Sequence, residues 1–177
     1  MDDIALQARV SKRTIYNVFG GKEQLFREIL AEALETAERF SAEAAATLAD
    51  TDDVEAELKA TARRLARAVL GGRIVRLRRL LIGEASRFPD LARDYYERAP
   101  GRVMATLAEA LRRFDQRGLL RIDDPQLASE HFAFLVLGAS LDRALFDAID
   151  EPPPADRVEA RAVAGVDVFL RAYAPHR

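Results

Sequence analysis

Residues 2–26 read DDIALQARVSKRTIYNVFGGKEQLF, and the spacing of their apolar residues predicts two short helices joined by a tight turn. Ser11 can cap the second helix, because its hydroxyl can accept a hydrogen bond from a free backbone N–H of the first turn. Gly20 and Gly21 can end that helix. The side chains expected to face inward are Ile4, Ala5 and Ala8 from the first helix, Val10 in the turn, and Ile15 and Phe19 from the second helix.

The outward face of the second helix carries cations and hydrogen-bonding groups, namely Lys12, Arg13, Thr14, Tyr16 and Asn17. From Arg9 to Lys22 there are four positive charges and no negative one, although the whole chain has a net charge of −2. This pattern is typical of a helix-turn-helix, in which the first turns of the second helix enter the major groove and meet base edges and phosphates. The competing interpretation is a helical hairpin whose exposed polar residues bind nothing.

The segment resembles the signature of the TetR (tetracycline-repressor) family of bacterial transcriptional regulators. The resemblance lies in Val10-Ser11-Lys12, Thr14-Ile15-Tyr16, Phe19 and Lys22-Glu23-Gln24-Leu25-Phe26. It implies that Thr14 and Tyr16 contact bases or phosphates, and that Lys22 grips a phosphate from the start of the following helix. It also implies that operator preference is set by Lys12, Arg13 and Asn17.

The chain departs from the family pattern in four places. Arg9 stands in the turn where glycine is usual, Val18 where many members have an aromatic residue, and Gly21 replaces a polar cap. Similar members also begin with an additional helix before this segment. Without it, a shared core of Ile4, Ile15, Phe19 and Phe26 would lack one wall. We therefore hypothesise that Met1 is an internal methionine of a longer reading frame or marks a truncation, which in-frame upstream coding sequence would test.

Apolar residues recur at helical spacing almost everywhere else, so the sequence predicts an all-α fold. The expected helices are a long amphipathic connecting helix from Lys22, one from near Thr51 or Asp52 to Gly71-Gly72, one at 73–87, one at 90–117 broken or kinked at Pro100-Gly101, one from Asp124-Pro125 to about 147, and one at about 155–174 after a proline linker at 152–154. We divide the chain into an N-terminally incomplete helix-turn-helix domain with its connecting helix at 1–40, and a helical effector-binding and dimerisation domain at 41–177.

Segments 84–91, 99–111 and 118–124 are similar to the effector domains of multidrug-efflux repressors. In such proteins the last two long helices pack against their symmetry mates, which implies a homodimer through the helices at about 125–148 and 155–174. The residues that suit this role are Leu127, Phe134, Leu135, Leu137, Gly138, Leu141 and Leu145. The alternative is that these residues form an ordinary core within one chain.

The resemblance also implies a small, largely apolar effector ligand bound among the middle helices. The candidate lining residues are Leu77, Leu81, Glu84, Phe88, Tyr95, Met104, Leu107, Phe114 and Phe132. Aromatic and methionine side chains at this spacing are also typical of a plain core. Glu84 either meets a cationic ligand or pairs with Arg87 or another arginine, and His131 is a candidate interior residue. A run of four arginines could bind an anion, but its spacing spreads them around the helix, which suits a solvated face: Arg73, Arg76, Arg78 and Arg79.

The composition argues against several other classes of protein. The chain has 177 residues, 49% of them hydrophobic and 32% charged, as in an ordinary globular protein. It has no cysteine, only two histidines and no phosphate-binding glycine loop, so we expect no enzyme, cofactor or metal site. No export signal or apolar run of transmembrane length is present, so we expect a cytoplasmic protein without a membrane partner, associated with the nucleoid when bound to DNA.

These features together predict a ligand-responsive transcriptional regulator. It would bind a pseudopalindromic operator in double-stranded DNA as a dimer, repress, and be released by a small molecule. The alternative is a helical ligand-binding or adaptor dimer that has lost DNA binding.

Overall fold

The computed structural model describes residues 1–49, 51–147 and 153–175, and over these ranges it contains helices and no strands. The elements are α1 (Asp2–Ala8), α2 (Lys12–Phe19), α3 (Lys22–Ala49), α4 (Val54–Leu70), α5 (Arg73–Glu84), α6 (Pro89–Tyr96), the π-helical segment η1 (Glu97–Gly101), α7 (Arg102–Gln116), α8 (Pro125–Phe146) and α9 (Ala155–Tyr173). The predicted all-α fold is confirmed. No described helix is both long and apolar enough to cross a membrane.

Polar side chains begin the helices close to where the sequence predicts. The carboxylate of Asp124 accepts the backbone N–H groups of Gln126 and Leu127 at 2.9 and 3.1 Å, and Pro125 fills the first helical position, where no N–H is needed. Asp53 caps α4 in the same way, accepting a first-turn N–H at 3.0 Å. Of the expected proline linker, residue 152 lies outside the described residues.

Prolines shape two helix ends. At Pro100-Gly101, where the sequence predicts a break or a kink, the structure has a π-helical segment through which α6 continues into α7. Proline lacks an N–H and its ring crowds the carbonyl of the preceding turn, so the helix widens instead of stopping. α5 ends at Glu84 and not at 87, because residues 85–87 form a turn in which the N–H groups of Arg87 and Phe88 both donate to the carbonyl of Glu84 at 2.9 Å. Phe88, which precedes Pro89, lies outside the helical region at φ −129°.

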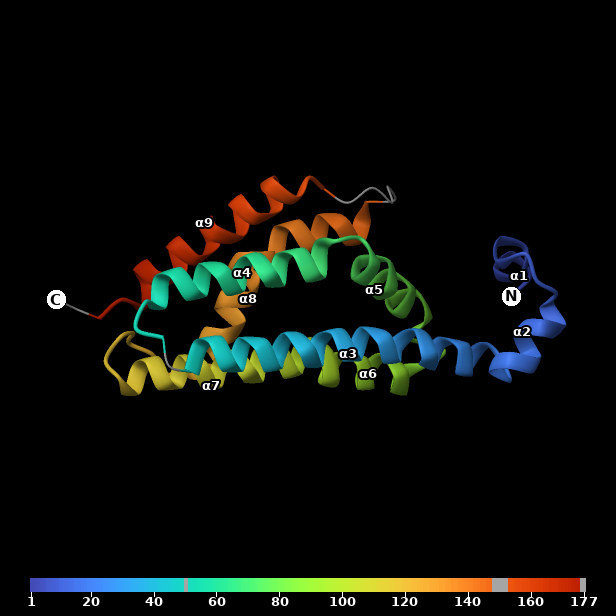
Figure 1. Cartoon of the computed structure of the whole chain (residues 1–177), viewed down its shortest axis with the longest axis horizontal. Coiled ribbons are helices and arrows are strands. Elements are labelled where there is room, and N and C mark those ends of the chain that lie inside the picture. Colours follow the sequence, from blue (N-terminus) through green and yellow to red (C-terminus); the bar gives the residue numbers. More distant parts are fainter. Residues whose placement is uncertain (50, 148–152, 176–177) are drawn as a thin grey trace.

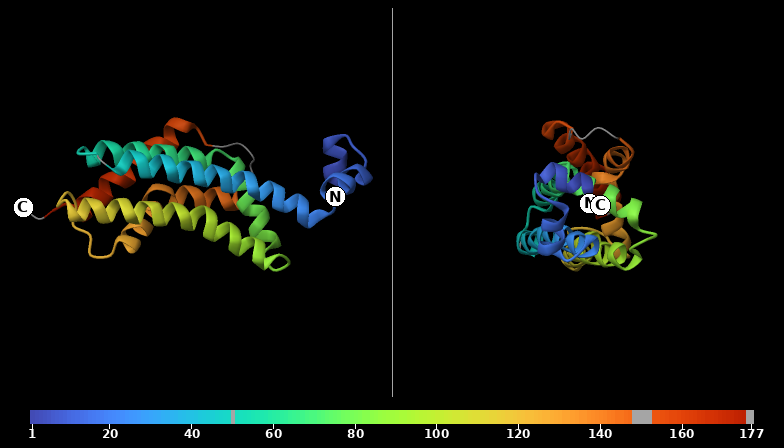
Figure 2. Two further views of the ribbon diagram at one scale, coloured as in Figure 1. Left: turned by 60° about the horizontal axis from the view of Figure 1, so that its bottom comes forward. Right: turned by 90° about the vertical axis from the view of Figure 1, so that its right-hand side faces the viewer.

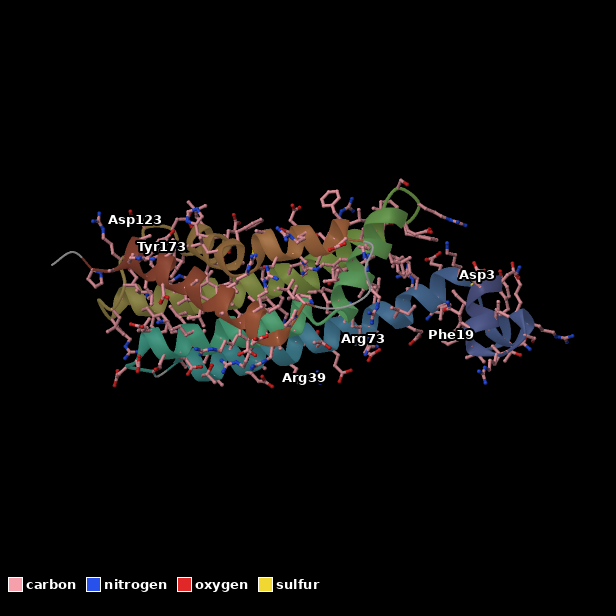
Figure 3. The ribbon with its side chains drawn as sticks, turned by 90° about the horizontal axis from the view of Figure 1, so that it is seen from above. Asp3, Phe19, Arg39, Arg73, Asp123 and Tyr173 are labelled. Carbon is pink, nitrogen blue, oxygen red and sulfur yellow. The ribbon has the colours of Figure 1, made fainter. Side chains whose placement is uncertain are left out.

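The molecule is elongated, and α3 runs along much of its length (Figure 1). α1 and α2 lie at one end of α3 and stand apart from the other helices, whereas the C-terminus lies at the opposite end (Figures 1 and 2). In Figure 3, Asp3 and Phe19 mark the first end, Asp123 and Tyr173 mark the other, and Arg73 lies between. The helix-turn-helix is thus attached to the body mainly through α3.

Two groups of buried side chains hold the body together. The larger joins the second half of α3 to α4, α7, α8 and α9 around Phe114, Phe132 and Phe169, each of them 0% exposed. The smaller joins the first half of α3 to α5, α6 and η1. It contains Phe26, whose ring centroid lies 6.1 Å from that of Phe88. The expectation that Phe26 shares a core with the helix-turn-helix is wrong, because its side chain packs on the far side of the α2–α3 junction.

α9 packs closely on α4 and α8. Gly165 lies where α9 meets α8, and a Cβ atom built there would be 2.4 Å from the carbonyl oxygen of Leu135. The two backbones can approach this closely because Gly165 has no side chain. Asp167 of α9 also forms an ion pair with Lys59 of α4, with 2.8 Å between the carboxylate oxygen and the ammonium nitrogen.

Candidate DNA-binding surface and effector cavity

The turn between α1 and α2 contains a strained backbone position. Arg9 has φ 54° and ψ 39°, and it is the one non-glycine residue with positive φ in the part of the chain that the structure describes. The N–H of Val10 donates to the carbonyl of Ala5 at 3.0 Å and closes the turn. Arg9 therefore takes the conformation that glycine usually supplies at this point, and adds a positive charge there.

Ser11 caps α2 as predicted. Its Oγ accepts the backbone N–H of Thr14 at 3.0 Å, and the two hydroxyl groups share a hydrogen bond of 2.8 Å. Gly20, at φ 72°, ends the helix in the left-handed region. The single buried residue of α2 is Ile15, which holds the opposite face of the helix outward.

Every predicted DNA contact on α2 is exposed to solvent, namely Lys12, Arg13, Thr14, Tyr16 and Asn17. The ammonium of Lys12 lies 3.0 Å from the Asp2 carboxylate of α1. This hydrogen bond raises the pKa of Lys12 and lowers the pKa of Asp2. Both side chains are well exposed, so the pair is weak enough for a phosphate to replace Asp2.

The apolar contact between α1 and α2 is smaller than predicted. Its buried side chains are Ala5 and Ile15. Ile4 and Val10 are 40% and 41% exposed, and Ala8 is also exposed, so the inward positions expected for these three residues are wrong. Helices of seven and eight residues that meet at a turn bring few side chains together.

Lys22 begins α3 beside α2, and its side chain points to the end of α5. Its ammonium lies 2.9 Å from the carboxylate of Glu84 at the end of α5, 62 residues away. The hydrogen bond from Lys22 lowers the pKa of Glu84. The ion-pair partner of Glu84 is therefore Lys22 of α3, and the alternative of a pair with Arg87 or another arginine is wrong.

A cavity of about 490 Å³ opens among α3 to α8, a volume within the usual range for small-molecule sites. Among the predicted lining residues, Leu81, Tyr95 and Met104 lie in its wall. The others lie elsewhere, in the core or at other contacts: Leu77, Glu84, Phe88, Leu107, Phe114 and Phe132. The aromatic residues Phe114 and Phe132 belong to the core, because large side chains fill the space between packed helices.

Sequence reasoning missed the walls that α3 and α8 contribute. α3 supplies Ala33, Thr36, Ala37 and Phe40, and α8 supplies Phe134, Leu137, Gly138, Leu141 and Leu145. The one signal in the sequence is the presence of small residues such as Ala33, Ala37 and Gly138. This signal is weak, because a small residue borders a cavity only where the neighbouring helix does not fill the space beside it. The tertiary arrangement alone shows that they border a cavity.

Polar groups are few in this wall. Arg78 of α5 and Tyr95 of α6 both line the cavity, and the Nε of Arg78 donates to the Tyr95 hydroxyl at 3.3 Å. Tyr95 is 6% exposed, whereas Arg78 is half-buried. Asp142 of α8 also lines the cavity but is exposed to solvent.

The arginines of α5 have separate environments, as expected from a spacing that spreads them around the helix. Arg73 pairs with Glu32 of α3, and Arg79 donates to the Asp147 carbonyl at 2.6 Å. Of the arginines on α5, Arg78 alone lines the main cavity. Successive residues of a helix point in different directions, so each meets a different neighbour.

α8 and α9 expose apolar side chains on the surface of the body. Leu127, Phe134, Leu135 and Phe146 of α8 are 46%, 72%, 40% and 85% exposed, and Val168 of α9 is 45% exposed. The four residues of α8 are separated by seven, one and eleven positions, which places them on one side of the helix. We call these five residues the α8–α9 apolar surface.

The predicted dimer residues divide between this surface and the interior. Leu137 is 9% exposed and belongs to the core, against which Leu141 packs. The alternative of an intrachain core therefore applies to these two residues, while Leu127, Phe134 and Leu135 remain on the surface. His131, a candidate interior residue, is exposed, and its Nδ1 lies 2.7 Å from the Tyr173 hydroxyl.

Two family profiles match the chain in the order of its fold. Residues 1–29 match the profile of bacterial regulatory proteins of the tetR family, and residues 56–175 match that of the C-terminal domain of AefR-like transcriptional repressors. A comparison with curated proteins found no match. The second profile covers more than half of the chain, so this protein belongs to the TetR family of transcriptional regulators.

Solved structures agree with this assignment. A crystal structure from Mesorhizobium loti, assigned to the TetR-family transcriptional regulators, is 32% identical over 98% of this chain and 85% of that one, with a TM-score of 0.82. The flavonoid-responsive regulator FrrA is 30% identical over 100% of this chain and 87% of its own, with a TM-score of 0.67. PfmR, a TetR-family regulator from Thermus thermophilus, shares the fold at 24% identity over 99% and 88% of the two chains, with a TM-score of 0.72.

Membership of this family defines the class of protein. The chain is a DNA-binding transcriptional regulator and not an enzyme, as the sequence analysis predicted.

Proposed function

We propose that this chain is a ligand-responsive repressor that binds a pseudopalindromic operator as a homodimer and leaves it when a small, largely apolar molecule occupies the cavity. The observation that carries the proposal is the course of α3. This helix starts at Lys22 beside the recognition helix, and its residues Ala33 to Phe40 form part of the cavity wall. A ligand that displaces this part of α3 would also displace α2, which is joined to its first residue by a short turn.

The exposed face of α2 supports operator binding. Lys12 and Arg13 can hold phosphates, while Thr14, Tyr16 and Asn17 can meet base edges or the sugar-phosphate chain. In a dimer the two copies of α2 would have to lie about one DNA turn, ~34 Å, apart. Such a protein would act on the nucleoid.

The α8–α9 apolar surface supports dimerisation. Phe146 and Phe134 are the two most exposed apolar side chains of α8. A two-fold contact would bury the same patch on both copies, and burying exposed aromatic side chains is favourable. Phe134 also lines the cavity, so a partner seated here would cover one wall of the effector site.

The cavity supports a response to a small molecule. Most of its wall is apolar, and its volume suits a ligand rather than a few waters. FrrA, which shares the fold and 30% identity, is a flavonoid-responsive regulator. Ligand response would follow if the ligand prefers a conformation in which the two recognition helices no longer fit the operator.

Operator binding is tested by fluorescence anisotropy on labelled DNA from the chain's own promoter region, at several salt concentrations. We expect binding that weakens with salt and is lost in Lys12→Ala and Tyr16→Ala. Arg39→Ala is the matched control, because Arg39 is an exposed cation of α3 far from α2 (Figure 3). Absence of binding to every promoter fragment would favour the alternative, a helical ligand-binding or adaptor dimer without DNA binding.

Dimerisation is tested by sedimentation equilibrium. Leu135→Glu places a charge in the α8–α9 apolar surface and is expected to shift the protein toward monomer. Val18→Glu is the control, because Val18 is 67% exposed on α2, outside that surface. Equal association of both variants and the wild type would refute this interface.

A further inference from the structure

The guanidinium of Arg78 is placed in a largely apolar wall, and no carboxylate of the described residues pairs with it. Its interaction with the residues that the structure describes is the hydrogen bond from Nε to the Tyr95 hydroxyl. Arginine has five N–H donors, so the two terminal nitrogens retain donors that no described protein group accepts. A half-buried charge in this position is unfavourable unless a partner of opposite charge joins it.

Tyr95 completes a pair of converging donors. Its hydroxyl oxygen accepts from Arg78, which leaves its own proton free to be donated in another direction. The phenol is held in place, because Tyr95 is 6% exposed and packs in the core between α3, α5 and α6. A cation and a neutral donor thus meet in one part of the cavity.

We propose that the effector has an apolar body with one anionic oxygen group, such as a carboxylate, and that Arg78 and Tyr95 bind this group. The inference rests on the proposed role of the cavity as the effector site, and adds the chemical class of the ligand. Charge-assisted hydrogen bonds from arginine to an anionic oxygen are among the strong polar contacts of proteins, and the apolar surroundings strengthen them.

Asp142 is the group in the cavity wall that opposes this assignment. Its carboxylate is exposed, so water and salt screen it, whereas the Arg78–Tyr95 pair is more enclosed. An effector with a cationic head would instead favour the Asp142 side, and the experiment below separates the two cases.

The test uses displacement of a neutral apolar dye, N-phenyl-naphthylamine, from the full chain at neutral pH. Three competitors share one alkyl body and differ in the head group: decanoate, decanol and decylamine. We expect decanoate to displace the dye with a dissociation constant about tenfold lower than that of decanol, the difference expected for one charge-assisted hydrogen bond. Decylamine should be the weakest of the three competitors. Arg78→Met should remove the preference for decanoate, and Tyr95→Phe should reduce it.

Arg76→Met is the matched control, because Arg76 is an exposed arginine of the same helix outside this cavity. Dye binding by each variant shows that the cavity is intact. Failure of the wild type to bind the dye would refute the cavity as an apolar site, and with it the proposed function. Dye binding without a preference for decanoate over decanol, a preference that survives in Arg78→Met, or tightest binding of decylamine would overturn the anionic-effector inference alone.

Discussion

Replacing Gly165 by alanine is expected to force α9 away from α8. The added Cβ would lie 2.4 Å from the carbonyl oxygen of Leu135, 2.7 Å from its carbon and 3.1 Å from the nitrogen of Val136, whereas ordinary contacts begin at 3.4 Å. All three are backbone atoms of a helix and cannot turn aside as a side chain can. The difference between 3.4 and 2.4 Å means that the helices must separate by about 1 Å.

The expected change in stability follows from two opposing effects. Overpacking a close contact costs about 1–3 kcal/mol. The better helix propensity of alanine offsets this by up to about 1 kcal/mol. Because the clash is with backbone atoms, the upper part of the overpacking range applies, about 2–3 kcal/mol. After an offset of about 1 kcal/mol, we expect Gly165→Ala to lower the free energy of unfolding by about 1–2 kcal/mol, or Tm by about 2–8 °C for a chain of this size.

The assay is urea unfolding followed by circular dichroism at one fixed protein concentration, because the stability of a dimer depends on concentration. Gly83→Ala is the matched control, since a Cβ at this position of α5 meets nothing within 4 Å. It should be neutral or slightly stabilising. Sedimentation of Gly165→Ala also reports on the dimer, because Leu135 belongs to the α8–α9 apolar surface. A Gly165→Ala protein as stable as the wild type would refute the close approach of the two helices.

Three further substitutions test the DNA-binding end. Arg9→Gly relieves a left-handed φ but adds entropy to the unfolded chain, so thermal unfolding should change little, while the lost cation weakens operator binding and its salt dependence. Glu84→Gln should release Lys22 for a phosphate and tighten operator binding at low salt; unchanged affinity would show that the two do not compete. In the wild type this ion pair stabilises the fold above the ordinary Glu84 pKa of 4.5, and the contribution is lost as the pH falls through the lowered pKa, which acid titration of stability would follow. Asp2→Asn should likewise free Lys12 and tighten binding in anisotropy measurements, most clearly at low salt.

The caps and ends of individual helices could be predicted from the sequence. Ser11 and Asp124 cap their helices, and Gly20 ends α2, because each of these interactions joins residues within one helical turn. The exposed polar face of α2 could be predicted for the same reason, because helical periodicity alone sets the direction of each side chain. With Ile15 buried, Tyr16 must lie on another side of the helix. Family membership could therefore be predicted from about twenty-five residues, those at 2–26.

Contacts between distant segments were decided by the tertiary structure. The sequence places Lys22 near DNA, but only the packing of α5 against α3 brings Glu84 to it from 62 residues away. Phe26 looks like part of the helix-turn-helix and is instead buried with Phe88, because the residue after a helix junction can pack on either neighbour.

The same distinction governs the cavity. The spacing of apolar residues along one helix shows which of them are buried, and it does not show whether the facing helix fills or leaves the space. Arg78 looks like the other arginines of α5 in the sequence, and only the packing of α5 against α6 brings its guanidinium to Tyr95 in the cavity wall. The sequence by itself thus determined the family and the exposed polar face of α2 through short-range periodicity and capping. The cavity was decided by how the helices pack, which depends on long-range contacts that local patterns do not record.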